Sequence, residues 1–337
     1  NRASSNVERA RFSTDEVVRL TLDFYKRNYI EGLFLSSGII RTPDYTMEQL
    51  VEVARALRED HGFKGYIHLK TIPDADPLLL DKAGQYADRL SINIELPKET
   101  SLRSFAPEKS APAIRGAMAD MKLRIDGSKA ERKAARRARP APFAPAGQST
   151  QMIIGADGAS DADIIATSSE LYAGYGLRRV YYSAYSPIPD ASSDLPPVKP
   201  PLIREHRLYQ ADWLFRFYGF ERGEIFDGVA DGMLDLAVDP KLAWALRHRA
   251  LFPVNINTAA REMLLRVPGI GTRSADRIIA SRKHGSLRLN DLRRITRALD
   301  KLLPFIETPD WTPGGLTDSA NLRARFAPPP EQLSLFA

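Results

Sequence analysis

Short apolar runs alternate with helix-like segments over the first 185 residues of the chain. Residues 14–29 have acidic side chains in a first turn and apolar ones at helical spacing, which predicts a helix. Five strands are expected after it, at 32–38, 65–72, 90–96, 151–157 and 179–185. Because helix-like segments separate these strands, the pattern favours parallel β-α-β units.

Polar and apolar side chains alternate within the expected strands, and the alternation indicates which faces are buried. Ser91, Asn93 and Glu95 share one face of the third strand, and the residues between them are apolar. His68 and Lys70 lie on a polar face of the second strand in the same way. If helices cover the apolar faces, the polar faces converge on a wet interior. We therefore expect a parallel barrel with a site at the carboxyl ends of its strands, and an open sheet with one solvated face is the alternative.

Residues 254–292 instead have the period of two helices joined by a tight turn. Asn257 or Thr258 is expected to cap the first helix, which ends at residues 267–271, Val-Pro-Gly-Ile-Gly. The two glycines that flank Ile270 allow positive φ and a close approach of the backbone to a ligand. The free amides at the start of the second helix should therefore point outward and bind an anion.

Basic residues concentrate around this turn and indicate which anion it binds. Residues 241–301 hold 14 Lys and Arg against 4 Asp and Glu, a balance of +10, whereas the whole chain carries +6. Arg282 and Lys283 continue the basic side of the second helix. The pattern predicts binding to nucleic-acid phosphates, and a helical hairpin that packs only against protein is the alternative. The residues expected to contact DNA are Val267, Gly269, Ile270, Gly271, Arg273 and Arg277.

Composition bounds the class of protein. With 337 residues and 43% apolar content, the chain can bury a sizeable core. No apolar run approaches the roughly 18 residues of a membrane span, and the polar start is no signal peptide. We therefore expect a cytoplasmic, nucleoid-associated protein without membrane partners. The chain has no cysteine and its five histidines lack zinc-site spacing, so no metal site is expected within it.

Two resemblances follow from these motifs. Residues 254–292, with an Asn-Ile-Asn-Thr-Ala entry and a Pro-Gly-Ile-Gly turn, resemble the competence-protein-like branch of the helix-hairpin-helix family. That resemblance implies binding to DNA backbones without reading the base sequence. Most of residues 1–305 resemble the radical S-adenosylmethionine (radical SAM) superfamily, most closely a branch of DNA modification and repair proteins that carry a C-terminal helix-hairpin-helix.

The radical SAM resemblance implies an α/β fold, a partial parallel (β/α)6 barrel followed by a small all-α helix-hairpin-helix domain. In that family a CxxxCxxC loop after the first strand holds a four-iron four-sulfur cluster. The loop is absent here, so we expect the first strand and its cysteines to lie upstream of Asn1. The second implied cofactor is S-adenosylmethionine. Reaction chemistry would belong to these cofactors, since no side chain is an obvious catalytic acid or base.

The resemblance also implies which residues bind S-adenosylmethionine. Some of them correspond to the family's glycine-rich segment that binds the methionyl amine, although the usual acidic residue of that segment is absent here. Others correspond to polar strand positions that contact the ribose or carboxylate, and the rest to segments beside the adenine. In chain order these residues are Ser36, Ser37, Gly38, Asn93, Glu95, Gly155, Tyr181 and Ser183. His68 and Lys70 are expected to lie behind them or to face the substrate. A structural hydrogen-bonding role is the alternative for each.

The expected domains are a barrel at 1–202 with a basic insertion at 97–148, a helical connector at 203–250, the helix-hairpin-helix domain at 251–306 and a tail at 307–337. Residues 122–139 of the insertion hold eight Lys and Arg against two Asp and Glu. They predict a mobile basic loop that embraces a duplex. A solvated, helix-rich excursion without a ligand is the alternative.

The last residues resemble the pentapeptide that binds the bacterial sliding clamp. Gln332, Leu333, Leu335 and Phe336 match its polar and apolar positions, and three prolines precede them at 328–330. A glutamine amide and apolar side chains on an extended segment suit a shallow cleft. Folding of the tail back onto the hairpin domain is the alternative.

Together these features predict a radical SAM enzyme that modifies or repairs a nucleotide in DNA. The expected partners are DNA, the sliding clamp and DNA repair enzymes. A non-catalytic DNA-binding adaptor with a degenerate barrel is the alternative, and the missing cysteines fit it literally. A helix-hairpin-helix glycosylase is disfavoured because Thr272 and Arg273 stand where its catalytic lysine is expected, and because a parallel barrel is foreign to that family.

Overall fold

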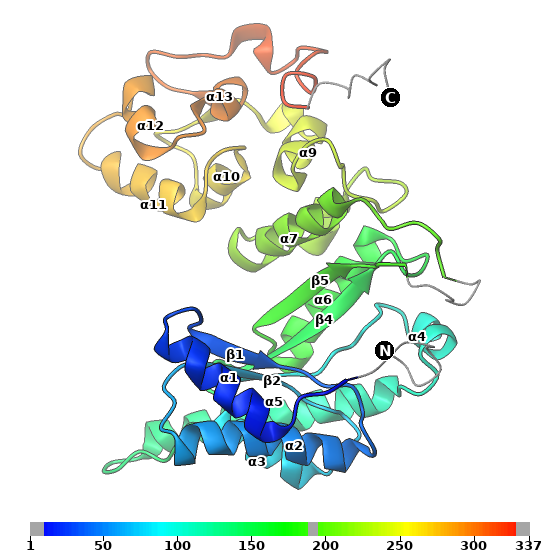
Figure 1. Cartoon of the computed structure of the whole chain (residues 1–337). Helices are drawn as coiled ribbons and strands as arrows, with labels where there is room; N and C mark the ends of the chain where they lie inside the picture. Colours follow the sequence, from blue (N-terminus) through cyan, green and yellow to red (C-terminus); the bar gives the residue numbers. More distant parts are fainter. Residues whose placement is uncertain (1–9, 188–194, 328–337) are drawn as a thin grey trace. The chain divides into compact units, whose positions relative to one another are not determined.

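The computed structural model describes residues 10–187 and 195–327 of the chain. The chain divides into two compact units, which we call unit 1 (residues 1–159 and 167–200) and unit 2 (residues 160–166 and 201–337) (Figure 1). No helix in the described ranges is both long and apolar enough to cross a membrane. The clamp-like residues Gln332, Leu333, Leu335 and Phe336 lie outside the described residues.

Unit 1 contains a curled parallel sheet, and its five strands follow one another in sequence order. The strands are β1 (Gly32–Leu35), β2 (Tyr66–Lys70), β3 (Arg89–Ser91), β4 (Gln148–Ile154) and β5 (Arg179–Ala184). This order is what repeated β-α-β units wound in one direction produce. The predicted α/β class is therefore confirmed, as a half-barrel. Regular β3 ends at Ser91, and one further bridge pairs Glu95 with Met152.

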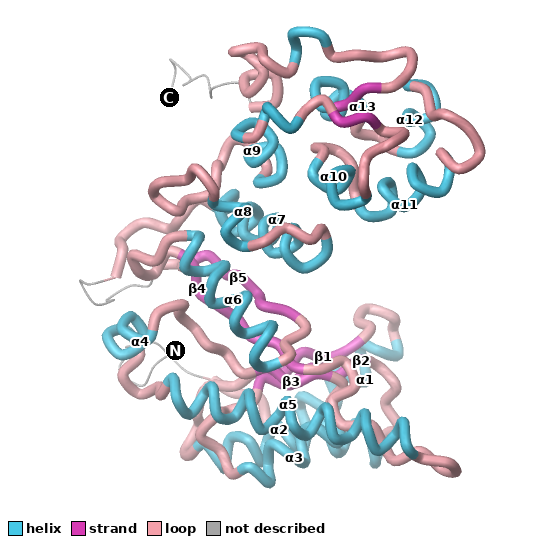
Figure 2. The backbone as a smooth tube through the Cα atoms, turned by 180° about the vertical axis from the view of Figure 1, so that it is seen from behind, coloured by secondary structure: helices cyan, strands magenta, loops and turns pink. Residues whose placement is uncertain are grey.

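The helices of unit 1 are α1 (Thr14–Lys26), α2 (Pro43–Arg55), α3 (Pro77–Tyr86), α4 (Glu99–Phe105) and α5 (Ala111–Ala134), with a π-helical turn η1 (Ala56–Asp60) after α2. Helix α6 (Asp161–Tyr175) belongs to unit 1 from Thr167 onward, and its first residues belong to unit 2. Side-chain caps start several of these helices, such as the reciprocal pair between Ser13 and Glu16 at α1. Figure 2 shows α2, α3 and α5 on one side of the sheet. On this side of the sheet, apolar residues of β2, β3 and β4 are fully buried, as Ile67, Leu90 and Met152 illustrate.

The opposite face of the sheet is polar, and we call it the inner face. The strand pairing places Phe34 beside His68, His68 beside Arg89, and Lys70 beside Ser91 on this face. The alternation predicted from the sequence is therefore present.

The predicted mobile basic loop at 122–139 is wrong, because most of this segment belongs to helix α5. Helix α5 has 24 residues and buries Ile114, Met118, Met121 and Ile125, which recur every three to four positions. The basic side chains occupy the other positions of α5, so the helical spacing of its apolar residues is hard to recognise in the sequence. Helix α5 links β3 to β4 as an ordinary crossover helix, and it is not merely a solvated excursion.

Unit 2 is mainly helical. Its helices are α7 (Leu202–Phe217), α8 (Arg222–Phe226), α9 (Pro240–Arg247), α10 (Arg261–Arg266), α11 (Thr272–Ser281), α12 (Leu289–Ile295) and α13 (Leu299–Leu302), with short 3-10 turns η2 (Arg249–Leu251), η3 (Leu303–Phe305) and η4 (Gly314–Leu316). Phe252 and Phe305 pack edge to face in its core, with ring centroids 5.1 Å apart.

A short parallel pair of strands, β6 (Val254–Asn255) and β7 (Ile306–Glu307), joins the two ends of the segment that contains α10 to α13. The amide of Ile256 donates to the carbonyl of Glu307, and Asn255 Nδ2 donates to Glu307 Oε1 at 3.1 Å. The register partners Val254 and Ile306, one from each strand, are buried.

Candidate nucleic-acid interface and cofactor site

The turn between α10 and α11 has the predicted helix, hairpin, helix geometry. Helix α10 ends at Arg266, and α11 begins at Thr272 with Gly271 as its N-cap and no side-chain cap. The amides of the first turn of α11 are therefore left for a ligand, and the helix dipole favours an anion there. The side chains of Val267 and Ile270 are buried, so these two residues can contact DNA only through their backbone.

The two hairpin glycines have different roles. Gly269 has a φ of +86°, and a Cβ there would overlap Leu302 Cδ1 and lie 3.0 Å from the carbonyl oxygen of Ala298. Gly271 has a φ of −90°, and a Cβ would meet only the hydroxyl of Tyr218, at 3.5 Å. Of the two glycines expected to allow positive φ, only Gly269 adopts it. Gly269 is needed because the hairpin lies directly against α13.

The hairpin is supported from behind by Lys241 of α9. Its ammonium donates to the carbonyl of Ile270 and lies 4.9 Å from the centroid of the Tyr218 ring. Burial lowers the pKa of Lys241 to about 7, and the nearby Asp239 carboxylate opposes this shift. Lys241 therefore stabilises the turn and does not contact phosphate. The sequence around Lys241 gives no sign of this role.

Two other basic residues of the motif also act inside the protein. Arg282 Nη1 donates to the carbonyl oxygens of Ile256 and Ala259 at 3.2 and 2.7 Å. Arg266 Nε pairs with Glu224 Oε1 at 2.6 Å. The expectation that Arg282 lies on the DNA-facing side is therefore wrong, because its guanidinium ties the end of α11 to the entry of the motif.

Asn257 does not cap α10, contrary to prediction. Helix α10 begins three residues after Thr258, and its N-cap, Ala260, offers no side-chain hydrogen bond. Instead, Asn257 Nδ2 donates to the carbonyl of Leu287 at 3.1 Å, and its Oδ1 accepts from the Leu287 amide at 2.7 Å. One side chain thus satisfies both backbone groups of a residue that follows α11, a long-range contact that local capping rules do not consider.

Six further basic residues form an exposed set on α11, on α12 and in the turns that follow them. Its members are Arg273, Arg277, Lys283, Arg293, Arg294 and Arg297. By contrast, Arg261 pairs with Asp276 at 2.8 Å. Within the described ranges, no carboxylate forms an ion pair with any member of the exposed basic set. These side chains are therefore available to a polyanion.

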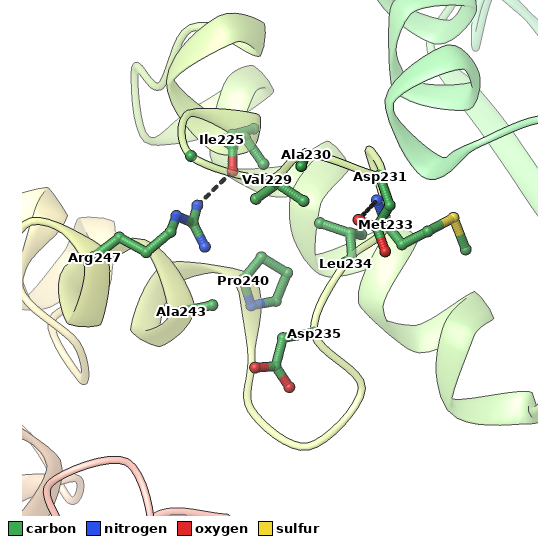
Figure 3. A pocket seen from close by; sticks show the side chains of 11 residues that line it. Ile225, Val229, Ala230, Asp231, Met233, Leu234, Asp235, Pro240, Ala243 and Arg247 are labelled. Atoms are coloured by element: carbon green, nitrogen blue, oxygen red, sulfur yellow. Dashed lines mark hydrogen bonds between the residues drawn. The ribbon is translucent and has the colours of Figure 1, made fainter. Parts of the chain in front are cut away.

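Unit 2 also holds a pocket of about 550 Å³ between the 228–235 loop and α8 and α9 (Figure 3). Its polar groups bind one another. Arg247 Nη2 donates to the carbonyl of Ile225 at 2.8 Å, and Asp231 Oδ1 accepts from the Met233 amide at 3.0 Å. Burial acts to raise the pKa of Asp235, but hydrogen bonds from Arg323 and two backbone amides outweigh it and lower the pKa. The pocket therefore offers little unused charge to a ligand.

Two of the predicted cofactor residues, Asn93 and Glu95, lie on the segment that follows β3, and each contacts a side chain from another part of unit 1. Glu95 has a φ of +67°, and its carboxylate pairs with Lys109 at 2.6 Å and with Lys70 at 3.7 Å. Asn93 Nδ2 donates to Gln151 Oε1 at 3.3 Å. Lys109 follows α4 and lies 14 positions after Glu95, so the sequence gives no signal for this pair.

The other predicted cofactor residues are more dispersed. Ser36, Ser37 and Gly38 form an exposed or half-exposed loop after β1, where Ser37 Oγ donates to the carbonyl of Gly38. Gly155 has a φ of +78° and lies against Pro200. Ser183 pairs with Ile153 in register, near the carboxyl end of β5. Tyr181 differs from these, because its hydroxyl lies 3.4 Å from Arg89 Nη1, at the start of β3.

A hollow of about 490 Å³ opens beside the carboxyl end of β4. It is lined by Thr100, Ser101, Ser104, Phe105, Ala156, Asp157, Gly158 and Pro196. Asp157 Oδ1 accepts from the Ala159 amide, but its Oδ2 is buried and has no hydrogen-bond partner in the described parts of the chain. A buried, unsatisfied acceptor is costly unless a ligand or water supplies a donor. None of the lining hydroxyls was a sequence-based candidate.

The comparisons with known proteins agree with the geometry of the hairpin. No curated protein and no solved structure matches the chain. Residues 252–299 match the family model described as the helix-hairpin-helix motif. The chain therefore contains a helix-hairpin-helix motif that supports DNA binding, with α10, the turn and α11 at its centre.

Proposed function

We propose that unit 2 binds DNA through its backbone phosphates, at the hairpin and the exposed basic set. The observation that carries this proposal is the uncapped start of α11, with Arg273 and Arg277 exposed on the same helix. Backbone amides at a helix start and arginine side chains both suit phosphate oxygens. Neither group reads base identity, so affinity should depend on salt much more than on sequence.

The test is anisotropy of a labelled duplex titrated with the full chain at several salt concentrations. Arg273→Ala with Arg277→Ala should reduce the slope of log K against log salt by about 2, because each lost phosphate contact removes about 0.9. Arg19→Ala with Lys26→Ala, two exposed basic residues of α1, is the matched control and should leave the slope unchanged. An unchanged slope in the α11 variant would contradict the proposal.

We further propose that unit 1 is the barrel of a radical SAM enzyme that acts on a nucleotide in DNA. Support comes from the parallel half-barrel, the polar inner face and the hollow beside β4. The buried, unsatisfied Asp157 carboxylate oxygen and the neighbouring hydroxyls fit the ribose and amino groups of S-adenosylmethionine. The proposal includes a partial (β/α)6 barrel as the architecture of this enzyme.

The iron-sulfur cluster does not fit these 337 residues, because they contain no cysteine. The proposal therefore requires cysteines from outside these residues. With such a cluster, S-adenosylmethionine supplies hydrogen-abstraction chemistry. The residues of this chain would bind and orient it, with Asp157 and Ser104 accepting hydrogen bonds in the hollow and Asn93 donating from the inner face. The Glu95–Lys109 pair would hold the extended segment after β3 in place.

Calorimetric titration of the chain with S-adenosylmethionine tests the cofactor assignment without any activity assay. Asp157→Asn should weaken binding about 10-fold, the usual effect of losing one charge-assisted hydrogen bond. Asp23→Asn, an exposed carboxylate on α1, is the control. If Asp157→Asn binds S-adenosylmethionine as tightly as the wild type does, the hollow is not the cofactor site. An absence of binding would favour the second candidate, a non-catalytic DNA-binding adaptor, which the lack of cysteine in these 337 residues also fits.

We also propose that the end of the chain recruits the sliding clamp and, with it, DNA repair enzymes. Support comes from the residue types at 332–336, Gln-Leu-Ser-Leu-Phe, and from the prolines before them. A peptide of residues 328–337 should bind the clamp with a dissociation constant on the order of micromolar, as expected for a small flexible anchor. Leu335→Ala with Phe336→Ala should abolish binding. Equal binding by both peptides would refute this role.

A further inference from the structure

A second group of side chains lies on the inner face, around Arg89 rather than Glu95. Phe34 and His68 are register neighbours whose ring centroids lie 4.4 Å apart, and His68 is in turn the register neighbour of Arg89. Tyr181 reaches Arg89 from β5 through its hydroxyl. Burial raises the pKa of Tyr66, and the nearby positive charge of Arg89 opposes this shift. These five residues, from four strands, form what we call the Arg89 patch.

Arg89 is not fully satisfied by the protein. Its Nη1 contacts the Tyr181 hydroxyl at 3.4 Å and its Nη2 donates to the carbonyl of Ala146 at 3.2 Å. Its Nε is buried and has no partner in the described residues, and the same holds for Ser91 Oγ on the same face. The adjacent Asp88 carboxylate is engaged elsewhere, by Arg58 at 2.7 Å. A guanidinium that has no carboxylate partner, together with an unpaired hydroxyl on the same strand, can bind an anion or the hydrogen-bonding edge of a base.

The rings of the patch supply a surface of a different kind. Phe34 is 60% exposed and Tyr66 is 41% exposed, although both lie on a strand face that is otherwise largely buried. Exposed aromatic faces next to an arginine are the arrangement on which unstacked bases stack. His68 adds a ring without adding charge, because burial, helped by Arg89, lowers its pKa to about 4 and keeps it neutral.

We propose that the Arg89 patch binds a single nucleotide, with its base stacked on Phe34 and Tyr66 and its phosphate or base edge hydrogen-bonded to Arg89 and Ser91. This inference rests on the proposed function, because DNA held by the hairpin would supply the nucleotide that the Arg89 patch binds. A free nucleotide has the same chemistry, so the two sources have to be separated by experiment. Tyr181 then belongs to the substrate side of the inner face and not to the adenine of a cofactor.

Two arms of one experiment separate these sources, both with the full chain. In the first, deoxynucleoside 5′-monophosphates are titrated and followed by saturation-transfer NMR. In the second, a duplex with one unpaired 2-aminopurine is titrated and its fluorescence is recorded, since stacking on a protein ring changes the emission of the unstacked base. Duplex anisotropy is measured in parallel, so that loss of hairpin binding is seen separately.

Phe34→Ala should weaken monophosphate binding about 10-fold, as removal of one stacking ring does, and its exposed position should leave the fold intact. Arg89→Met should weaken binding by about 10-fold or more through the lost charged hydrogen bonds. The matched controls are Phe12→Ala and Arg19→Met, two exposed residues of unit 1 away from the strands, and neither should have an effect. If Arg89→Met unfolds, Phe34→Ala alone decides the stacking claim.

The outcomes distinguish this inference from the DNA-binding proposal. A 2-aminopurine response that needs Phe34, with duplex affinity unchanged, supports an extruded nucleotide as the ligand. Monophosphate binding without any response from the duplex supports a free nucleotide and overturns the DNA-borne source. If the monophosphates do not bind at millimolar concentration, or bind Phe34→Ala and Arg89→Met as tightly as the wild type, the patch is no nucleotide site, whatever the hairpin binds.

Discussion

Replacing Gly269 with alanine should destabilise unit 2, whereas the same change at Gly271 should not. Alanine at a φ of +86° costs about 1–2 kcal/mol relative to glycine. Its Cβ would also overlap Leu302 Cδ1 and press on the Ala298 carbonyl, and such overpacking costs typically about 1–3 kcal/mol. The two costs sum to about 2–5 kcal/mol. Because the Leu302 side chain can move aside whereas the backbone of Ala298 cannot, we expect the free energy of unfolding to fall by about 2–4 kcal/mol.

The assay is urea unfolding followed by tryptophan fluorescence. All three tryptophans of the chain, Trp213, Trp244 and Trp311, lie in unit 2, so this signal reports that unit alone. Trp244 is buried and should respond strongly when the core opens. Gly271→Ala is the matched control, because its φ is ordinary and its Cβ would make only a normal contact. Its expected loss of stability is below about 1 kcal/mol.

Two results would refute this reasoning. A Gly269→Ala variant as stable as the wild type would mean that the turn does not lie against α13. Equal losses at Gly269 and Gly271 would mean that both glycines serve the same conformation, as the sequence alone suggests. Duplex affinity, compared at urea concentrations where each variant is folded, should change little in either case.

Three further predictions concern single side chains. Because the pKa of Lys241 is lowered to about 7 from 10.5, folded unit 2 binds fewer protons than the unfolded chain between these values, and its stability should rise with pH across that window. Lys241→Met should remove this rise in urea titrations at pH 6.5 and 9.5. The pKa of His68 is lowered to about 4 from 6.5, so its contribution to stability is present above pH 6.5 and is lost as pH falls toward 4. This loss of stability should appear as a loss of far-UV circular dichroism in acid, and His68→Gln should reduce it. Asn257→Ala should cost unit 2 about 2 kcal/mol by tryptophan fluorescence, because both backbone groups of Leu287 lose their partner, whereas Thr258→Ala should cost much less.

Periodicity predicted the features that depend on neighbours in sequence. Alternation of Ser91, Asn93 and Glu95 with apolar residues was enough to predict a polar sheet face, because a strand side chain has only two directions. The hairpin could be located because few residues other than Gly269 suit its turn. What periodicity missed are contacts between segments far apart in the chain.

Glu95 illustrates the limit. Its residue type and strand position indicated a polar site, but its two cationic partners come from β2 and from the segment after α4. Arg89 was overlooked because it precedes the expected strand by one position, so its place on the inner face depended on where β3 begins. Tyr181 shows the same dependence, since only the stagger of β5 against β3 decides whether it reaches the Glu95 region or Arg89. Stagger between strands is set by packing and is not encoded locally.

The pairing of β6 with β7 has a mechanical consequence for a protein that holds a polymer. The two strands are parallel, and the chain enters the motif at the start of β6 and leaves it at the end of β7. A pull on the flanking chain therefore loads the pair along its length, so the backbone hydrogen bond and the Asn255–Glu307 contact share the force instead of opening in turn. Tension between the chain before β6 and the chain after β7 would thus be carried by this short clasp, and the hairpin that lies between the two strands would be spared.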